Sequence, residues 1–188
     1  MSIKKILRYT ERNESKRFTY LETINKLSPE QLVYIDESGI DHNMLKVHCW
    51  IKKGSELVGE RSGKARGRTS VIAALNQEKV NVPLIYKGTM NTALFLGWLE
   101  KQLIPSLLKG QVVVMDNASI HKSEQVKEKI EAANCTLLYL PPYSPDLNPI
   151  ENYWAVMKKH IRKIRHQCSD ITEAIETTLK IEKKWFYS

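Results

Sequence analysis

Cysteine is scarce in this chain, and long apolar runs are missing. Three cysteines occur among 188 residues, far apart and without a CxxC pair, which excludes a disulfide framework and a cysteine-rich zinc site. The longest stretch without a charged residue, 132–145, has 14 residues and three prolines, so it is too short and too interrupted to span a bilayer. The N-terminal residues show no apolar segment typical of a secretory signal. We therefore expect a protein of a reducing cytoplasm.

Acidic residues are outnumbered by basic ones. The chain has 29 Lys and Arg against 21 Asp and Glu, a formal net charge of +8. A basic balance favours a polyanionic partner, and nucleic acid is the first candidate. Hydrophobic residues make up 42% of the sequence, which excludes wholesale disorder. The length fits one domain with room for a small appendage.

Apolar periodicity predicts strands that alternate with helices. Short β-branched runs indicate strands at 32–36, 46–51, 69–75, 80–86, 111–116 and 135–140. Helical spacing follows at 91–108, 123–133, 150–166 and from 170 towards 184. The proline-rich segment 141–149 predicts a stiff, extended connector. Residues 1–30 are rich in charged residues and show no clear two-fold alternation, and residues 28–31 resemble a helix start or a single capped turn. This order indicates an α/β domain with a mixed sheet.

Two of the expected strands end in aspartate, Asp36 and Asp116. In open α/β sheets, functional groups gather at the carboxyl ends of strands. If these two strands are parallel neighbours, the two carboxylates lie side by side, and a divalent cation relieves their repulsion. Each aspartate taken alone is also an ordinary turn residue.

A third carboxylate opens the helix that follows the connector. Glu151 lies off the apolar face of that helix, on a stripe that it shares with Lys158, Arg162 and Arg165. Three carboxylates beside a basic row suit phosphoryl transfer on a polyanion. Two metal ions roughly 3.5–4 Å apart hold the attacking and leaving oxygens, while basic side chains hold the phosphates. A glutamate in a first helical turn and a solvated basic face explain each residue separately, but not their coincidence.

Three segments carry a more specific pattern. They read DESG at Asp36–Gly39, DNASIHKS at Asp116–Ser123 and LPPYSPDLNPIE at Leu140–Glu151. Together they resemble DDE transposases of the mariner superfamily, in its bacterial insertion-sequence branch. The 34 residues between Asp116 and Glu151 match the spacing of that branch. The resemblance covers about residues 30–165, most of the chain.

The resemblance implies a ribonuclease H-like fold, a mixed five-stranded sheet flanked by helices. It also implies cut-and-paste transposition. In this reaction one enzyme acts as DNA endonuclease and strand transferase and inserts the excised element at TA dinucleotides. Asp36, Asp116 and Glu151 match the family's three catalytic and metal-binding residues, with Mg²⁺ or Mn²⁺ as cofactor and two ions per site. In that assignment Asp36 holds both ions. The implied partners are double-stranded DNA, both transposon ends and target, and a second copy of the chain on that DNA. The implied location is the bacterial cytoplasm, at the nucleoid and away from membranes.

The segment 52–68 combines basic residues with four glycines. A flexible basic loop can become ordered on DNA or on a partner subunit, and mariner-like relatives use a loop at this place to clasp the other protomer. The alternative is a solvated hairpin without a partner. The predicted DNA-binding residues are Lys52, Lys53, Arg61, Lys64, Arg66 and Arg68 here, with Lys158, Arg162 and Arg165 on the later helix.

Several polar residues adjoin the three carboxylates. His121 either reaches the scissile phosphate or the metal site, or is a polar residue at a helix entry. Asn117 and Asn148 are expected to fix loops by hydrogen bonds to the backbone. Glu37 follows Asp36 on a strand and therefore points to the opposite face, which favours a structural or surface role.

Full-length relatives carry N-terminal helix-turn-helix domains, and residues 1–30 are too few for two such modules. We therefore expect an N-terminal charged segment or linker at 1–30 and a catalytic domain at 31–188. The DNA-reading domain is expected to be absent or separately encoded. Two alternatives stay open: a nuclease of the same fold without strand transfer, and an inactive DNA-binding or regulatory remnant of a transposase.

Overall fold

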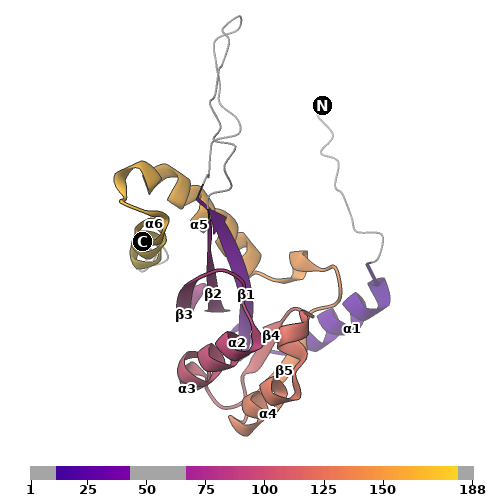
Figure 1. Cartoon of the computed structure of the whole chain (residues 1–188). Coiled ribbons are helices and arrows are strands. Elements are labelled where there is room, and N and C mark those ends of the chain that lie inside the picture. The colour runs from indigo at the N-terminus through magenta and orange to yellow at the C-terminus, as the bar shows by residue number, and fades with distance from the viewer. Residues whose placement is uncertain (1–11, 43–66, 182–188) are drawn as a thin grey trace, which may run out of the picture. The chain divides into compact units, whose positions relative to one another are not determined.

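The computed structural model describes residues 12–42 and 67–181, and five strands within them form one sheet (Figure 1). The strand order is β3-β2-β1-β4-β5. The strands are β1 (Leu32–Asp41), β2 (Arg68–Asn76), β3 (Lys79–Lys87), β4 (Val112–Met115) and β5 (Thr136–Tyr139). Strand β4 runs parallel to both β1 and β5, whereas β2 and β3 are joined by a two-residue turn that only antiparallel strands permit. The expected mixed five-stranded sheet is confirmed. The strand expected at 46–51 lies outside the described residues.

Six α-helices accompany the sheet within the described residues. They are α1 (Glu14–Ile24), α2 (Thr92–Trp98), α3 (Ile104–Ser106), α4 (Glu124–Ala132), α5 (Ile150–Ile164) and α6 (Ile171–Ile181). None of the helices in residues 12–42 and 67–181 is long and apolar enough to cross a membrane.

The described residues divide into two compact units. The first contains residues 12–37, Ile72–Leu84 and Met90–Tyr153, and the second contains residues 38–42, 67–71, Ile85–Thr89 and 154–181. Asp36, Asp116 and Glu151 all belong to the first unit. The candidate site can therefore be described within one compact body.

Alternation along the parallel strands sends their side chains to two faces of the sheet. Leu32 of β1 and Val112 of β4 share a buried cluster with Tyr20 of α1. Because Leu32 and Asp36 are four residues apart on β1, Asp36 lies on this same face, which α1 covers. Glu37 lies on the opposite face.

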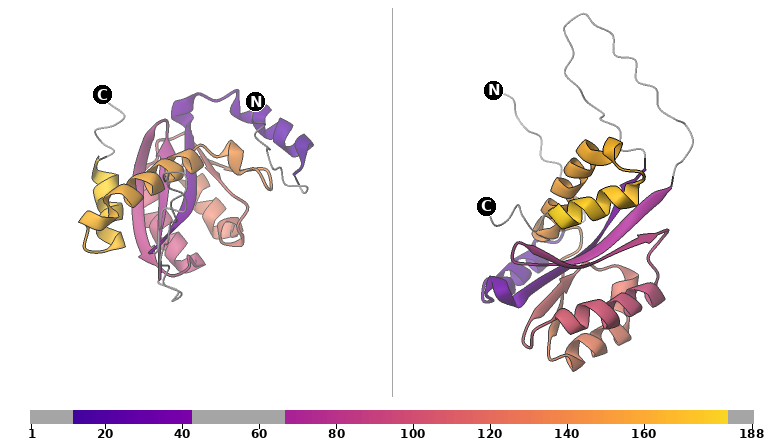
Figure 2. Two further views of the ribbon diagram at one scale, coloured as in Figure 1. Left: turned by 90° about the horizontal axis from the view of Figure 1, so that it is seen from above. Right: turned by 90° about the vertical axis from the view of Figure 1, so that its left-hand side faces the viewer.

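The charged segment 1–30 contains a helix that the sequence does not predict. Helix α1 begins after Asn13, whose side-chain Oδ1 accepts a hydrogen bond of 2.9 Å from the backbone N of Lys16. Its buried residues are Arg17 and Tyr20, one turn apart. Because one of these two buried residues is an arginine, the helix shows no apolar periodicity in the sequence. In both views of Figure 2, α1 (indigo) lies apart from α2 and α4 of the same unit.

The expected helix at 91–108 is present as three short pieces. Asn91 caps α2, and its Oδ1 accepts a hydrogen bond of 2.8 Å from the backbone N of Leu94. The chain then passes through a π-helical turn at Leu99–Leu103 before α3, which contains Pro105. Proline has no backbone N–H and its ring crowds the preceding turn. The π-turn that precedes α3 widens the backbone, so the helix is interrupted close to Pro105.

Candidate active site at the ends of β1 and β4

Asp36 and Asp116 occupy matching positions on neighbouring parallel strands. The register pairs Leu32 with Val112 and Tyr34 with Val114, a difference of 80 residues in each pair. The same difference separates Asp36 from Asp116. Neighbouring strands lie about 4.8 Å apart, so the register brings the two aspartates to adjacent places where β4 ends. This confirms the expectation that the two strands are parallel neighbours.

The carboxylate of Asp116 is held through one of its two oxygens. Its Oδ1 accepts a hydrogen bond of 2.9 Å from the backbone N of Ala118 and one of 2.6 Å from Nδ1 of His121. These two bonds keep the pKa of Asp116 below its usual range, and the bond from His121 has the larger effect. Its Oδ2 makes no hydrogen bond to the described residues, and the side chain is 51% exposed. One oxygen therefore fixes the orientation, while the other is accessible to a ligand.

His121 lies between two carboxylates and is buried. Its Nε2 lies 3.5 Å from Oε1 of Glu37, and its ring packs on Phe95 with 4.6 Å between ring centroids. Burial lowers the pKa of His121, but the hydrogen bond to Asp116 and the interaction with Glu37 outweigh it and raise the pKa to about 9. The histidine is therefore a cation at neutral pH, and both ring nitrogens carry protons.

The contact between Glu37 and His121 was not predicted from the sequence. Glu37 does lie on the face opposite Asp36, as the alternation predicted, and this is the face from which it reaches His121. The two residues are 84 positions apart, so only the strand register brings them together. A signal was nevertheless available, because a glutamate on a buried face needs a cationic partner.

The connector between β5 and α5 is tied down close to Asp116. Nδ2 of Asn117 donates a short hydrogen bond to the backbone O of Leu140, which is the backbone bond expected of this asparagine. The connector is not extended along its whole length as predicted, because a 3₁₀ turn forms at Pro145–Leu147. Its cause is local: the backbone N–H groups of Leu147 and Asn148 donate to the carbonyls of Ser144 and Pro145.

Glu151 stands in the first turn of α5 with its side chain exposed. Its backbone N donates a hydrogen bond of 3.1 Å to the backbone O of Asn148. Asn148 is buried, and its Oδ1 accepts no hydrogen bond from the described residues. Its backbone carbonyl, rather than its Oδ1, thus holds the start of the helix within the part of the chain that the structure describes.

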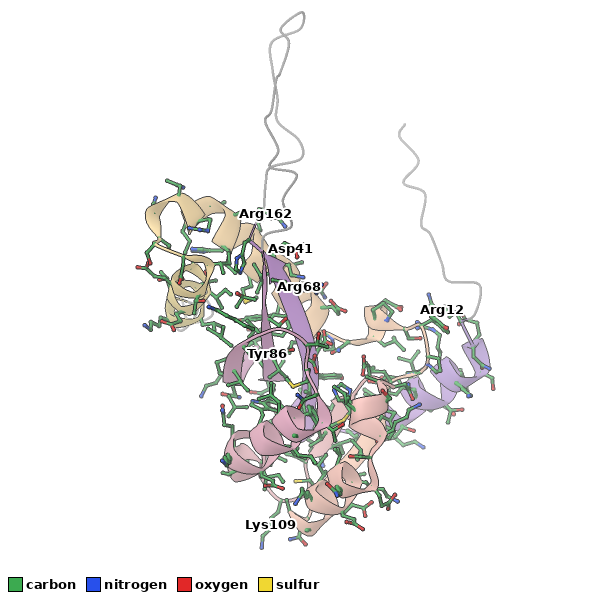
Figure 3. The ribbon with its side chains drawn as sticks, in the orientation of Figure 1. Arg12, Asp41, Arg68, Tyr86, Lys109 and Arg162 are labelled. Atoms are coloured by element: carbon green, nitrogen blue, oxygen red, sulfur yellow. The ribbon has the colours of Figure 1, made fainter. Side chains whose placement is uncertain are left out.

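The predicted DNA-binding residues are described only in part. Lys52, Lys53, Arg61, Lys64 and Arg66 lie outside the described residues. Arg68 is exposed on β2, and its guanidinium fills the space beside Gly39 that a Cβ atom would occupy. On α5, Arg162 is exposed and Lys158 is half-buried. Half-buried Arg165 follows α5, and its Nη1 donates a hydrogen bond of 3.0 Å to the backbone O of Cys168. Figure 3 labels Arg68 and Arg162.

The donor set at the strand ends fits a divalent cation. Carboxylate oxygens are the ligands that Mg²⁺ and Mn²⁺ prefer, and Oδ2 of Asp116 is not engaged by the described residues. Within residues 12–42 and 67–181, however, no three His, Cys, Asp or Glu side chains converge closely enough to hold an ion. Because like charges repel, a cation between the three carboxylates would favour their convergence. The structure thus pairs Asp36 with Asp116 without completing the expected cluster with Glu151.

Residues 31–173 match the family described as DDE superfamily endonuclease. The Tcb2 transposase of Caenorhabditis briggsae is 36% identical over 72 residues, which cover 34% of this chain and 26% of that protein. The Tc3 transposase of Caenorhabditis elegans is 30% identical over 105 residues, which cover 54% of this chain and 32% of that protein. An insertion element IS630 protein of Shigella sonnei is 27% identical over 106 residues, with 55% and 30% covered. The matches thus span about a third or less of each relative.

Solved structures show the same fold. The Mos1 strand transfer complex superposes with a TM-score of 0.67 at 21% identity and covers 98% of this chain and 64% of that chain. Mos1 paired-end complexes with Mn and with Mg give TM-scores of 0.59 and 0.62 at 19% and 20% identity, covering 98% and 97% of this chain and 65% of each of those chains. The catalytic core domain of BIV integrase gives 0.53 at 11% identity, with 83% and 85% covered. The expected ribonuclease H-like fold is confirmed, and with the family match the chain belongs to the DDE superfamily of endonucleases, as the resemblance to mariner-type transposases predicted.

Proposed function

We propose that this chain is the catalytic domain of a cut-and-paste transposase that cleaves DNA at transposon ends and joins the ends to target DNA at TA dinucleotides. The observation that carries the proposal is the parallel register of β1 and β4. Continued by two residues, this register would bring Asp36 next to Asp116. The DDE family match over residues 31–173 supports it. So does the likeness of the fold to that of Mos1 in complexes with transposon ends.

Asp36, Asp116 and Glu151 would hold two Mg²⁺ or Mn²⁺ ions. When bound, the ions supply Lewis-acid activation of the attacking oxygen and stabilisation of the leaving oxygen. His121 and the backbone of Ala118 orient Asp116 so that one of its oxygens faces away from the protein's own hydrogen bonds. Such orientation of a ligand by its neighbours raises metal affinity.

The remaining parts of the proposal concern partners. The basic segment 52–68 and the cations of α5 would bind DNA phosphates without reading sequence, so binding would weaken steeply with salt. A second copy of the chain would assemble on the DNA, and a separately encoded helix-turn-helix domain would read the transposon ends. The reaction would take place in the bacterial cytoplasm, at the nucleoid.

The proposal predicts both cleavage and strand transfer. The full chain is incubated with Mn²⁺, supercoiled plasmid and a labelled duplex with a free 3′-hydroxyl end. We expect nicked plasmid and covalently joined label, with the junctions sequenced at TA dinucleotides. Asp116→Asn should lose both products, whereas Glu131→Gln, which neutralises an exposed carboxylate on α4, should keep both.

Each other outcome contradicts the proposal in a different way. Nicking without joining would identify a nuclease that lacks strand transfer. If the labelled ends were joined to the plasmid at all dinucleotides alike, the proposed specificity for TA targets would be wrong. Plasmid binding without Mn²⁺-dependent nicking would identify an inactive DNA-binding remnant.

A further inference from the structure

Helix α1 lies outside the region that defines the family. The family match begins at residue 31, whereas α1 spans Glu14–Ile24. The helix is nevertheless packed into the first unit, because Tyr20 is 5% exposed and belongs to the buried cluster with Leu32 and Val112. A helix that only linked two domains would not need to bury side chains in the sheet.

Arg17 of α1 is a buried cation that binds the connector. It is 6% exposed, and its guanidinium donates two hydrogen bonds to Asp146, from Nη1 to Oδ1 at 3.1 Å and from Nη2 to Oδ2 at 2.8 Å. This bidentate geometry fixes both the distance and the angle between an arginine and a carboxylate. Those bonds hold the pKa of Asp146 below its usual range.

A second arginine reaches the same carboxylate. Nη2 of Arg12 donates a hydrogen bond of 3.2 Å to Oδ2 of Asp146, and Figure 3 shows Arg12 at the N-terminal end of α1, beside the connector. Apolar contact adds to the polar ones, because Leu147 packs against the cluster that contains Tyr20. The 3₁₀ turn of the connector is therefore held against α1 by charge and by packing.

The connector is thus fixed at two points, which flank Pro141, Pro142 and Pro145. Asn117, the residue after Asp116, binds the backbone of Leu140 at its start, and Arg17 binds Asp146 further along. Glu151 follows Asp146 by five residues, and its backbone is tied to Asn148. The place of Glu151 relative to Asp116 therefore depends on both attachments.

We propose that α1 is a positioning element of the active site and that Arg17, acting through Asp146, sets the place from which Glu151 reaches the site. This inference rests on the proposed function, since it assigns Glu151 to the metal-binding set. Arg17 does not touch the reacting atoms in this account. It acts on them through the connector.

The test compares Arg17→Gln, Asp146→Asn and the double variant with Lys16→Gln, which removes an exposed cation from the same helix. Mn²⁺ is titrated into each full chain by calorimetry, well below its melting temperature. We expect the apparent Mn²⁺ affinity to fall about 10- to 100-fold in both single variants, because residues that orient metal ligands have effects of this size. The double variant should bind Mn²⁺ no more weakly than either single variant. Arg17→Lys should recover only part of the Mn²⁺ affinity, and Lys16→Gln should bind Mn²⁺ as tightly as the wild type.

A second readout does not depend on metal. Amide hydrogen exchange is followed at Leu147, Asn148 and Glu151, whose backbone N–H groups hold the connector turn and the start of α5. We expect exchange at these three amides to be at least about tenfold faster in Arg17→Gln than in Lys16→Gln, because the turn opens locally once its anchor is lost.

The two readouts separate the failure of the inference from the failure of the proposed function. The inference would be overturned if Arg17→Gln bound Mn²⁺ as tightly as the wild type and differed only in a lower melting temperature. Arg17 would then stabilise the fold without positioning Glu151. If the wild type itself binds no Mn²⁺, the proposed function fails. Unchanged amide hydrogen exchange in Arg17→Gln would overturn the inference whether or not the protein binds Mn²⁺. Should Arg17→Gln not fold, Asp146→Asn carries the same test, because Asp146 is exposed.

Discussion

Asp36→Asn is expected to abolish Mn²⁺-dependent DNA cleavage while leaving DNA binding intact. The substitution keeps the shape of the side chain but removes the charge that would hold the metal ions beside Asp116. Metal ions contribute several kcal/mol to stabilising a phosphoryl-transfer transition state, so the rate should fall on the order of 10³-fold or more. The measurement is the initial rate of plasmid nicking in Mn²⁺.

The matched control for this prediction lies on the same strand. Asp41→Asn makes the same change at an exposed position at the end of β1, and it should leave the nicking rate within about twofold of the wild type, since surface substitutions have small effects. DNA affinity, measured at one fixed salt concentration, should be equal in the wild type and in both variants. Retained cleavage in Asp36→Asn would remove this residue from the catalytic set.

His121→Gln is expected to lower the free energy of unfolding by about 1 to 3 kcal/mol, because the buried imidazole loses its charged hydrogen bond to the half-exposed Asp116. The imidazole is 3% exposed, bonds Asp116 and lies against Phe95. The measurement is urea unfolding at pH 7 in EDTA, so that metal binding does not contribute. His166→Gln, at an exposed position, should change the unfolding free energy by less than about 0.5 kcal/mol. A similarly small effect of His121→Gln would show that the network does not stabilise the fold.

The pH dependence of the same measurement has a definite sign. The folded-state pKa of His121 is about 9, against an ordinary value of 6.5, so the folded protein binds more protons than the unfolded chain between these two values. The stabilising contribution of His121 should therefore be complete below pH 6.5 and should be lost as the pH rises through 9. Its full size is about 3 kcal/mol, since each unit of pKa difference is worth about 1.4 kcal/mol. His121→Gln should lack this component, and parallel profiles for the two proteins would contradict it.

The centre of the fold could be predicted because its patterns are local. The runs that end in Asp36 and Asp116 are short and β-branched, and such runs indicate buried strands wherever they occur. Helix α5, which carries Glu151 in its first turn, separates its apolar and basic residues so clearly that the sequence alone shows which face is buried. These features supplied the strands, the helix and the three carboxylates.

The contacts that hold the site could not be predicted, because they join distant parts of the chain. Arg17 and Asp146 are 129 residues apart, and neither looks like a core residue in the sequence. Helix α1 escaped detection because its buried stripe contains an arginine. The pairing of Glu37 with His121 depends on strand order, which no local pattern records.

The most direct test of the central claim is calorimetric titration of Mn²⁺ into the full chain, beside Asp36→Asn and Glu151→Gln and with Asp41→Asn as control. The account predicts saturable binding in the wild type and in Asp41→Asn, and loss of that binding in the other two variants, because each would lack a ligand. Absence of saturable binding even with DNA present would contradict the account. Equal binding in all four proteins would show that the ions are held elsewhere.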